Sequence, residues 1–149
     1  MTISIDQALL QHFDHGNFAL DMVFENGDYA VWNGTTNSYQ YRTGAYKTTI
    51  GRPYVELLVI QNDVTPYSLK HSDQTDGIMR IILQYPLNQG AVLAKMKADE
   101  IVQAFKLGQS LSYGGVKLTI MGSSRGPGAP EESWYKISLT LPYRAFLTR

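Results

Sequence analysis

Two polar side chains near the C-terminus have the spacing of a catalytic pair. Ser133 and Lys136 match the S-x-x-K pattern of penicillin-recognising enzymes, in which the serine is the nucleophile. That chemistry requires the serine and the lysine on one face of a helix. Residues 134–141 instead alternate between apolar and polar side chains, which predicts a strand and directs Ser133 and Lys136 to opposite faces. We therefore do not expect this serine to act as a nucleophile.

A second group of polar side chains lies in a segment without apolar periodicity. Ser68, His71 and Asp73 could in principle form a triad. The same histidine could bind a metal ion together with the carboxylates of Asp63, Asp73 and Asp76. All of these residues lie in one expected loop, however, without a nucleophile elbow, oxyanion donors or a second segment that supplies ligands. A solvated polar loop is the favoured interpretation.

The other two histidines also have a structural explanation. His12 and His15 have the i, i+3 spacing of a metal-binding pair, with Asp14 between them. Both come at the C-terminal end of a predicted helix, where the helix dipole alone favours a cationic histidine. We expect no metal site there.

The composition excludes further chemistry. The 149 residues include no cysteine, which excludes disulfides, thiolate nucleophiles and Cys-rich zinc sites. Neither a G-x-x-x-x-G-K-[ST] motif nor a G-x-G-x-x-G motif between a strand and a helix is present, so no phosphate cradle is expected. We expect a protein that is not an enzyme and binds no cofactor.

The spacing of apolar residues predicts the elements that hold these side chains. Ser4 fits the N-cap of a capping box, which predicts a short helix over residues 4–15. The period then changes to that of a strand over residues 18–25, and the Asn-Gly pair at 26–27 predicts a type I′ hairpin turn into a strand over residues 28–32.

The rest of the chain alternates between regular elements and polar segments. Ala94, Ala98 and Ile101 form the apolar stripe of an amphipathic helix. That helix is expected at residues 91–106, and further strands at residues 55–60, 78–85, 116–120 and 134–141. Loops are expected at residues 33–53, at residues 61–76 and at the Gly- and Pro-rich residues 122–130.

These elements predict an α+β fold. We expect a single domain over residues 1–149, with a largely antiparallel mixed sheet, one long helix packed on it and a short N-terminal helix. The sheet face away from the helix is of mixed character and is left for contact with something else. The side chains expected on it include Arg80, Thr119, Trp134 and Lys136.

Charge is divided unevenly along the chain. Residues 1–41 hold five acidic and no basic residues, whereas residues 42–149 hold thirteen basic and eight acidic residues. The two segments can lie side by side in one monomer, or they can attract each other between copies that join head to tail. The net charge is zero, so ten tyrosines and two tryptophans suit protein interfaces better than nucleic acid.

The sequence also predicts where the protein resides. The first basic residue is Arg42, and no apolar run approaches the length of a membrane span. We expect a soluble protein made in the cytoplasm, without a membrane partner.

Several segments of the predicted strands and of the long helix follow one another in a specific order. They are residues 24–26 (FEN), 53–59 (PYVELLV), 77–86 (GIMRIILQYP), 88–90 (NQG), 101–105 (IVQAF) and 134–144 (WYKISLTLPYR). In this order and spacing they resemble the tail terminator proteins of long-tailed, siphovirus-type bacteriophages or prophages. The resemblance spans most of residues 18–146.

The resemblance implies a structural role in the virion. Such proteins form a hexameric ring in the neck region, on the head-proximal end of the tail tube, where they end tube polymerisation and join the tail to the head. The implied partners are other copies of the chain, the major tail tube protein and the head-tail connector or head completion protein, with DNA only passing through the lumen.

On this hypothesis the polar segments at 33–50, 61–77 and 122–132 contact the partners. The charged residues expected at these interfaces are Asp63, Arg125, Glu131 and Glu132. Two alternatives remain open: another neck or head-completion subunit of the virion, and a small α+β ligand-binding or isomerase-like domain with an apolar pocket.

Overall fold

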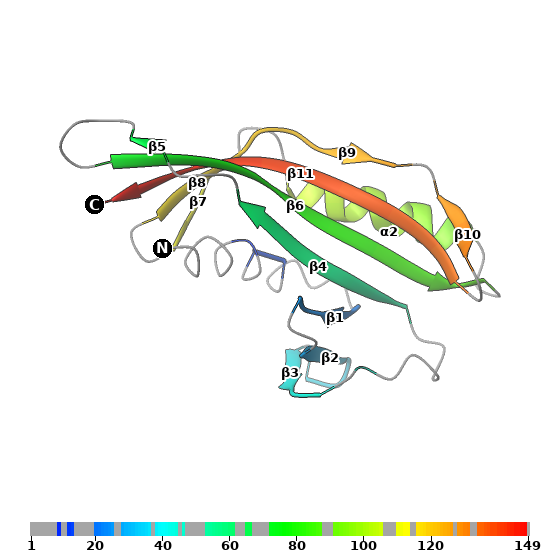
Figure 1. The fold of residues 1–149 in the computed structure, drawn as a ribbon. Helices are drawn as coiled ribbons and strands as arrows, with labels where there is room; N and C mark the ends of the chain where they lie inside the picture. The colour runs from blue at the N-terminus through cyan, green and yellow to red at the C-terminus, as the bar shows by residue number, and fades with distance from the viewer. Residues whose placement is uncertain are drawn as a thin grey trace.

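The architecture is that of one curved sheet with a helix against one face. In this computed structural model the described residues are 9, 12–13, 20–25, 28–36, 38–44, 46, 53–61, 65–66, 72–87, 91–105, 110–113, 116–126, 128–131 and 134–148. Two long strands, β6 (Ser72–Pro86) and β11 (Trp134–Thr148), run side by side through the sheet, and α2 (Ala91–Ala104) lies against them (Figure 1).

The sheet is mixed and largely antiparallel, as the sequence predicts. Its path runs in the order β3-β2-β1-β4-β6-β11-β8-β7, and only the pairing of β1 with β4 is parallel among the described strands. The remaining strands of this path are β1 (Asp21–Val23), β2 (Tyr29–Asn33), β3 (Ser38–Arg42), β4 (Tyr54–Gln61), β7 (Ser110–Tyr113) and β8 (Val116–Ile120). Three short strands extend it: β5 (Thr65–Pro66) pairs with β6, while β9 (Ser124–Arg125) and β10 (Ala129–Glu131) pair with β11.

Alternation along the long strands explains how the sheet separates its two faces. In β11 the side chains of Ile137, Leu139 and Leu141 are buried, whereas Ser138 between them is exposed. On β6 the same alternation buries Met79, Ile81 and Leu83. Successive strand residues point to opposite faces, so these side chains gather on the face that α2 covers.

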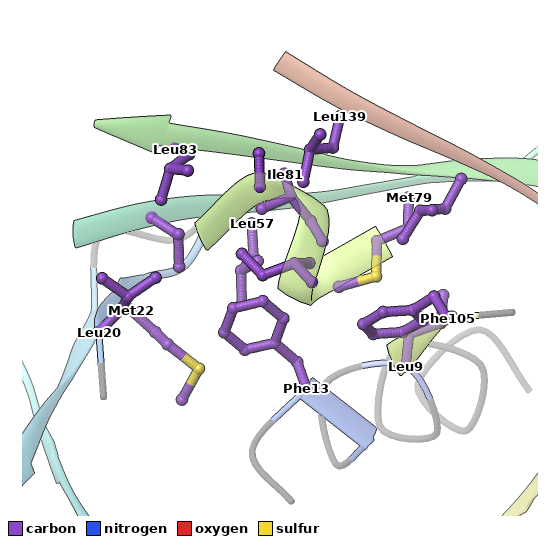
Figure 2. Close-up of a cluster of buried hydrophobic side chains, with 14 of the residues drawn as sticks. Leu9, Phe13, Leu20, Met22, Leu57, Met79, Ile81, Leu83, Phe105 and Leu139 are labelled. Carbon is purple, nitrogen blue, oxygen red and sulfur yellow. The ribbon is translucent and has the colours of Figure 1, made fainter. Parts of the chain in front are cut away.

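The hydrophobic core lies between this sheet face, α2 and the start of the chain. Ala94, Ala98 and Ile101 form the buried stripe of α2, as their spacing predicts. Leu9 and Phe13 are fully buried against the same cluster, and Figure 2 shows Phe13 pointing toward the side chains of the sheet. The predicted N-terminal helix over residues 4–15 falls mostly outside the described residues and stays a prediction.

The polar segments contain more sheet than the sequence predicts. The expectation of a loop over residues 33–53 is wrong at β3, which pairs with β2 along all five of its residues. The side chain of Asn33 organises the turn between them, because its Oδ1 accepts hydrogen bonds from the amides of Thr35 and Thr36 at 2.9 and 3.4 Å.

Two further loop predictions are also wrong. The segment at 61–76 contains β5 and the start of β6, and the segment at 122–130 contains β9 and the start of β10. The reason is the length of β6 and β11. Each strand has 15 residues, so its backbone extends beyond its apolar centre and can pair there with a further strand. The sequence does not predict the short strand β7.

Candidate functional site

Of the carboxylates considered for a metal site, the structure describes the side chain of Asp76. Asp76 is on β6, where its Oδ1 accepts a hydrogen bond from Nε of Arg144 at 3.0 Å in an exposed ion pair. Asp63, Ser68 and His71 fall outside the described residues, as does Ser133. Within the described part of the chain, no group of three or more metal-ligating side chains comes together.

His12 has a structural contact at a helix terminus. Its Nε2 lies 2.7 Å from the carbonyl oxygen of Ala104, the last residue of α2, and donates a hydrogen bond to it. The imidazole also packs edge-on against the ring of Phe105, with ring centroids 4.7 Å apart. The sequence predicts His12 at the C-terminal end of its own helix over residues 4–15, whereas the carbonyl that it bonds lies at the end of α2. His15 and Asp14 fall outside the described residues.

Two of the four charged residues expected at interfaces fall on described strands. Arg125 is on β9, and its Nη1 lies 3.1 Å from Oδ1 of Asp99 on α2 in an exposed ion pair. Glu131 ends β10. Asp63 and Glu132 fall outside the described residues, so the four residues are not shown together.

Two of the acidic residues in the segment 1–41 accept hydrogen bonds from other parts of the molecule. Asp21 is buried, with 2% of its surface exposed. Its two carboxylate oxygens accept hydrogen bonds from the amide of Trp32 at 3.0 Å and from the hydroxyl of Tyr46 at 2.5 Å. Glu25 accepts a hydrogen bond from the amide of Val59 at 2.6 Å. Burial removes Asp21 from the acidic surface, whereas Glu25 is exposed and remains part of it.

A chain of aromatic rings runs from β2 to the start of β11. Tyr29, Tyr46, Tyr54 and Trp134 are in successive contact, with ring centroids 5.4, 5.0 and 5.2 Å apart. Burial, reinforced by the charge of Glu56, raises the pKa of Tyr54. These tyrosines thus stabilise the fold rather than forming a free stacking surface.

The outer face of α2 exposes a cluster of apolar side chains. Val92, Leu93 and Met96 have 69%, 51% and 63% of their surface exposed. They lie outside the stripe that Ala94 and Ala98 bury, because α-helical residues spaced differently face different sides. We call Val92, Leu93 and Met96 the α2 ridge. The signal was present in the sequence as apolar residues outside the buried stripe.

A hollow lies on the face of the sheet that α2 does not cover. Its apolar lining comes from Ile60, Ile78, Met121 and Pro142, and it has a volume of about 350 Å³. We call the space that these four residues line the sheet hollow. Ile60 and Met121 are 46% and 44% exposed. The Asp76–Arg144 ion pair forms part of the lining.

A glycine permits the close packing beneath this hollow. A Cβ on Gly77 would overlap the carbonyl oxygen of Ile60 and lie 2.5 Å from the hydroxyl oxygen of Tyr143. The Tyr143 ring is buried across from Gly77, its partner in the pairing of β6 with β11. The end of β4 and the Tyr143 ring can therefore approach β6 only at a residue without a side chain.

The two apolar surfaces form the best candidate site on the described residues. Neither carries a cluster of nucleophiles, bases or metal ligands, and both fit contact with another protein surface. No helix in the described part of the chain has the length and apolar character needed to cross a bilayer.

Comparisons with known proteins identify the family. A solved structure shares the fold with a TM-score of 0.68 and 16% sequence identity, over 95% of this chain and 92% of that chain. No curated protein sequence matches the chain. The family model described as phage tail terminator protein matches residues 4–143. Because this match spans nearly the whole sequence, the chain belongs to the phage tail terminator protein family.

Proposed function

We propose that this chain forms a hexameric ring on the head-proximal end of a phage tail tube, ends polymerisation of the tube and provides the surface to which the head joins. The match of the family model to residues 4–143 carries this proposal. Membership of the family gives the chain a structural role in the phage tail. The ring, its position and its effect on polymerisation are the proposal.

The fold suits a subunit whose task is contact rather than chemistry. The long strands and α2 enclose one well-packed core, which holds the surfaces in fixed positions. The α2 ridge and the sheet hollow are exposed apolar surfaces that contact with another protein would cover. A ring subunit needs a surface for each neighbour and others for the tube and the head.

The proposed partners are other copies of the chain, the major tail tube protein and the head-tail connector or completion protein. DNA would pass through the lumen without being a binding partner. We place the contacts to the tube and the head at the polar segments that carry Asp63, Arg125, Glu131 and Glu132. Arg125 and Glu131 lie on β9 and β10, which pair with the outer edge of β11.

The test measures tail length and head joining in a phage that lacks this protein, with and without the chain supplied from a plasmid. Without the chain we expect tails of irregular, excessive length and heads that remain unjoined in electron micrographs. The plasmid copy should restore tails of uniform length. A plasmid that encodes the Leu139→Asp variant, whose charge falls in the buried core, is the control for a folded product. Tails of normal length without the chain would contradict the proposal.

Another neck or head-completion subunit remains the second structural hypothesis, since such a protein would also belong at the head-proximal end of the tail. Loss of such a subunit should leave tail length uniform and block only head joining. Tail length therefore separates the two hypotheses in the same experiment.

A further inference from the structure

We propose that the α2 ridge of one copy inserts into the sheet hollow of the next copy, so that these two surfaces form the subunit contact. The inference rests on the self-association in the proposed function and names the surfaces that produce it. The occupant of each surface is a second copy of this chain.

The α2 ridge presents three exposed apolar side chains on one side of the helix. Val92 and Met96 are one helical turn apart, so their side chains lie one above the other on the side of α2 away from the sheet. Leu93 widens the ridge beside them. The three side chains are more than half exposed, and water around them is released when a partner covers them.

The sheet hollow has the complementary form. Ile60, Ile78, Met121 and Pro142 line a concave volume of about 350 Å³, which is large enough to receive one or two apolar side chains. Its lining is supported from below by the tight packing of Tyr143 over Gly77. The exposed apolar ridge and the concave apolar hollow of one chain can thus form the two sides of a contact between copies.

The positions of the two surfaces favour a ring or a filament over a closed dimer. Ile78 lies on the sheet face opposite to its neighbour Met79, which is buried on the face that α2 covers. The ridge is on the outer side of α2, so the two surfaces face in opposite directions. A contact between two different surfaces is heterologous, and each copy retains one free surface until a ring closes.

A lysine beside the ridge and a carboxylate at the edge of the hollow carry opposite charges. Lys95 lies beside the ridge residues on α2, and it has no ion-pair partner among the described residues. Asp76 lines the hollow, and its ion pair with Arg144 is about half exposed. Lys95 of one copy can therefore approach Asp76 of the next. The zero net charge of the chain removes long-range repulsion between copies.

The experiment measures the mass of the purified full chain by light scattering over a concentration series. Met96→Glu changes the ridge and Ile60→Glu changes the hollow, both at exposed positions where folding tolerates a charge. Gln103→Glu is the matched control, since it adds the same charge to an exposed position two turns further along α2. Circular dichroism and thermal unfolding confirm that each variant is folded.

We expect the wild-type chain and Gln103→Glu to assemble, and Met96→Glu and Ile60→Glu each to be monomeric. A mixture of the two monomeric variants is the decisive sample. Each retains one intact surface, so one pair of intact surfaces can join them, and the mixture should have the mass of a dimer and no more. A mixture that remains monomeric would contradict a contact between ridge and hollow.

The charge pair is tested in the same assay. Lys95→Glu places a carboxylate opposite Asp76, and we expect it to weaken association about tenfold. Asp76→Asn in the same chain removes the repulsion and leaves Arg144 to attract the new carboxylate, which should restore association. Lack of recovery in the double variant would show that Lys95 does not face Asp76.

The absence of native cysteine permits a direct measure of proximity. The variant with Met96→Cys and Met121→Cys should form a ladder of disulfide-linked oligomers under mild oxidation, whereas Gln103→Cys with Met121→Cys should not. Wild-type assembly that persists in both glutamate variants would overturn the inference and leave the proposed function standing. A wild-type chain that is monomeric throughout would overturn the inference too, and tail length would still decide the proposed function.

Discussion

Tyrosine rings lie over glycines at two places on the sheet. Tyr143 covers Gly77, and Tyr135 covers Gly128 so closely that a Cβ there would overlap its ring. The aromatic ring fills the space that the glycine leaves on the pleated surface and protects its backbone from water. At the residue scale each ring occupies the space that a side chain at the glycine would need.

Gly77→Ala should destabilise the protein strongly. The new Cβ would overlap the carbonyl oxygen of Ile60, which is backbone and cannot rotate away. We expect a loss of about 3 kcal/mol in the free energy of unfolding, measured by urea denaturation. Gly122→Ala is the control, since a Cβ at Gly122 meets nothing within 4 Å. Equal stability of the two variants would contradict the packing described for Gly77.

The buried tyrosines should make the protein sensitive to high pH. Burial raises the pKa of Tyr54 above its usual value of 10.0, with the charge of Glu56 as a second cause. Burial also raises the pKa of Tyr85, with Glu100 as the second cause. The unfolded chain then loses these protons first. The corresponding stability is present in full below pH 10 and is lost as the pH rises from about 10 through the raised pKa values.

The measurement is thermal unfolding between pH 8 and pH 11, with phenolate absorbance recorded in parallel. The variant with both Tyr54→Phe and Tyr85→Phe should lose less stability above pH 10 than the wild-type chain does, because two of the groups that ionise on unfolding are absent. Identical slopes of stability against pH in the two proteins would contradict the raised pKa values.

At the scale of elements, the start of the chain is held to the end of α2. The hydrogen bond from His12 to the carbonyl of Ala104 satisfies one of the acceptors that a helix leaves free at its C-terminus. Phe13 next to it is fully buried and lies near the ring of Phe105, with centroids 6.4 Å apart. A polar contact and an apolar one thus hold His12 and Phe13 against the end of α2.

Two substitutions of His12 separate the hydrogen bond from the ring contact. His12→Phe keeps a ring against Phe105 but lacks the donor, and it should lower the free energy of unfolding by about 1 kcal/mol. His12→Ala removes both contacts, and the lost ring pair should cost about 1 kcal/mol more. Urea denaturation of the three proteins gives these values. Wild-type stability in both variants would show that this contact does not hold the N-terminal segment.

The elements predicted best from the sequence are those whose own side chains form the core. The apolar stripe of α2 and the alternation of residues 134–141 each place their buried residues correctly. Elements whose pairing depends on a distant strand were missed. The strands β9 and β10 lie in a Gly- and Pro-rich segment without an apolar period, and they form because β11 offers them a long edge.

The strand β3 shows a signal that the flanking sequence obscured. Tyr39 and Tyr41 alternate with polar residues, and Asn33 forms the preceding turn, but glycines on both sides favoured a loop.

The candidate site was harder to predict for a different reason. The sequence shows that Val92 and Met96 lie outside the stripe of Ala94 and Ala98, but both faces are apolar, and only the position of the sheet shows which of them is buried.

At the scale of the whole molecule, each surface has a distinct place on the sheet. The α2 ridge and the sheet hollow lie on opposite faces, which suits contacts to neighbours around a ring. The edge of β11 carries β9 and β10, with Arg125 on the exposed side of this edge. This division leaves the β9–β10 edge for contacts to a different partner.

Arg125→Glu tests that division in the complemented phage. If Arg125 contacts the tube or the head, reversal of its charge should leave ring assembly intact and increase the fraction of overlong tails or unjoined heads. A loss of about 1.4 kcal/mol in one such contact lowers its binding constant tenfold. Light scattering of the purified variant verifies ring assembly, and electron micrographs give the tail lengths.

The ion pair of Arg125 with Asp99 provides the matched control. Asp99→Asn removes this exposed pair while leaving the arginine free, and exposed pairs contribute at most about 1 kcal/mol to stability. Tail length and head joining should therefore be normal in Asp99→Asn and defective in Arg125→Glu. Equal defects in both variants would assign Arg125 to the support of α2, and normal tails in both would remove it from the interface. Only a defect confined to Arg125→Glu places a partner at this edge, because the intramolecular pair is lost in both proteins and cannot explain a difference between them.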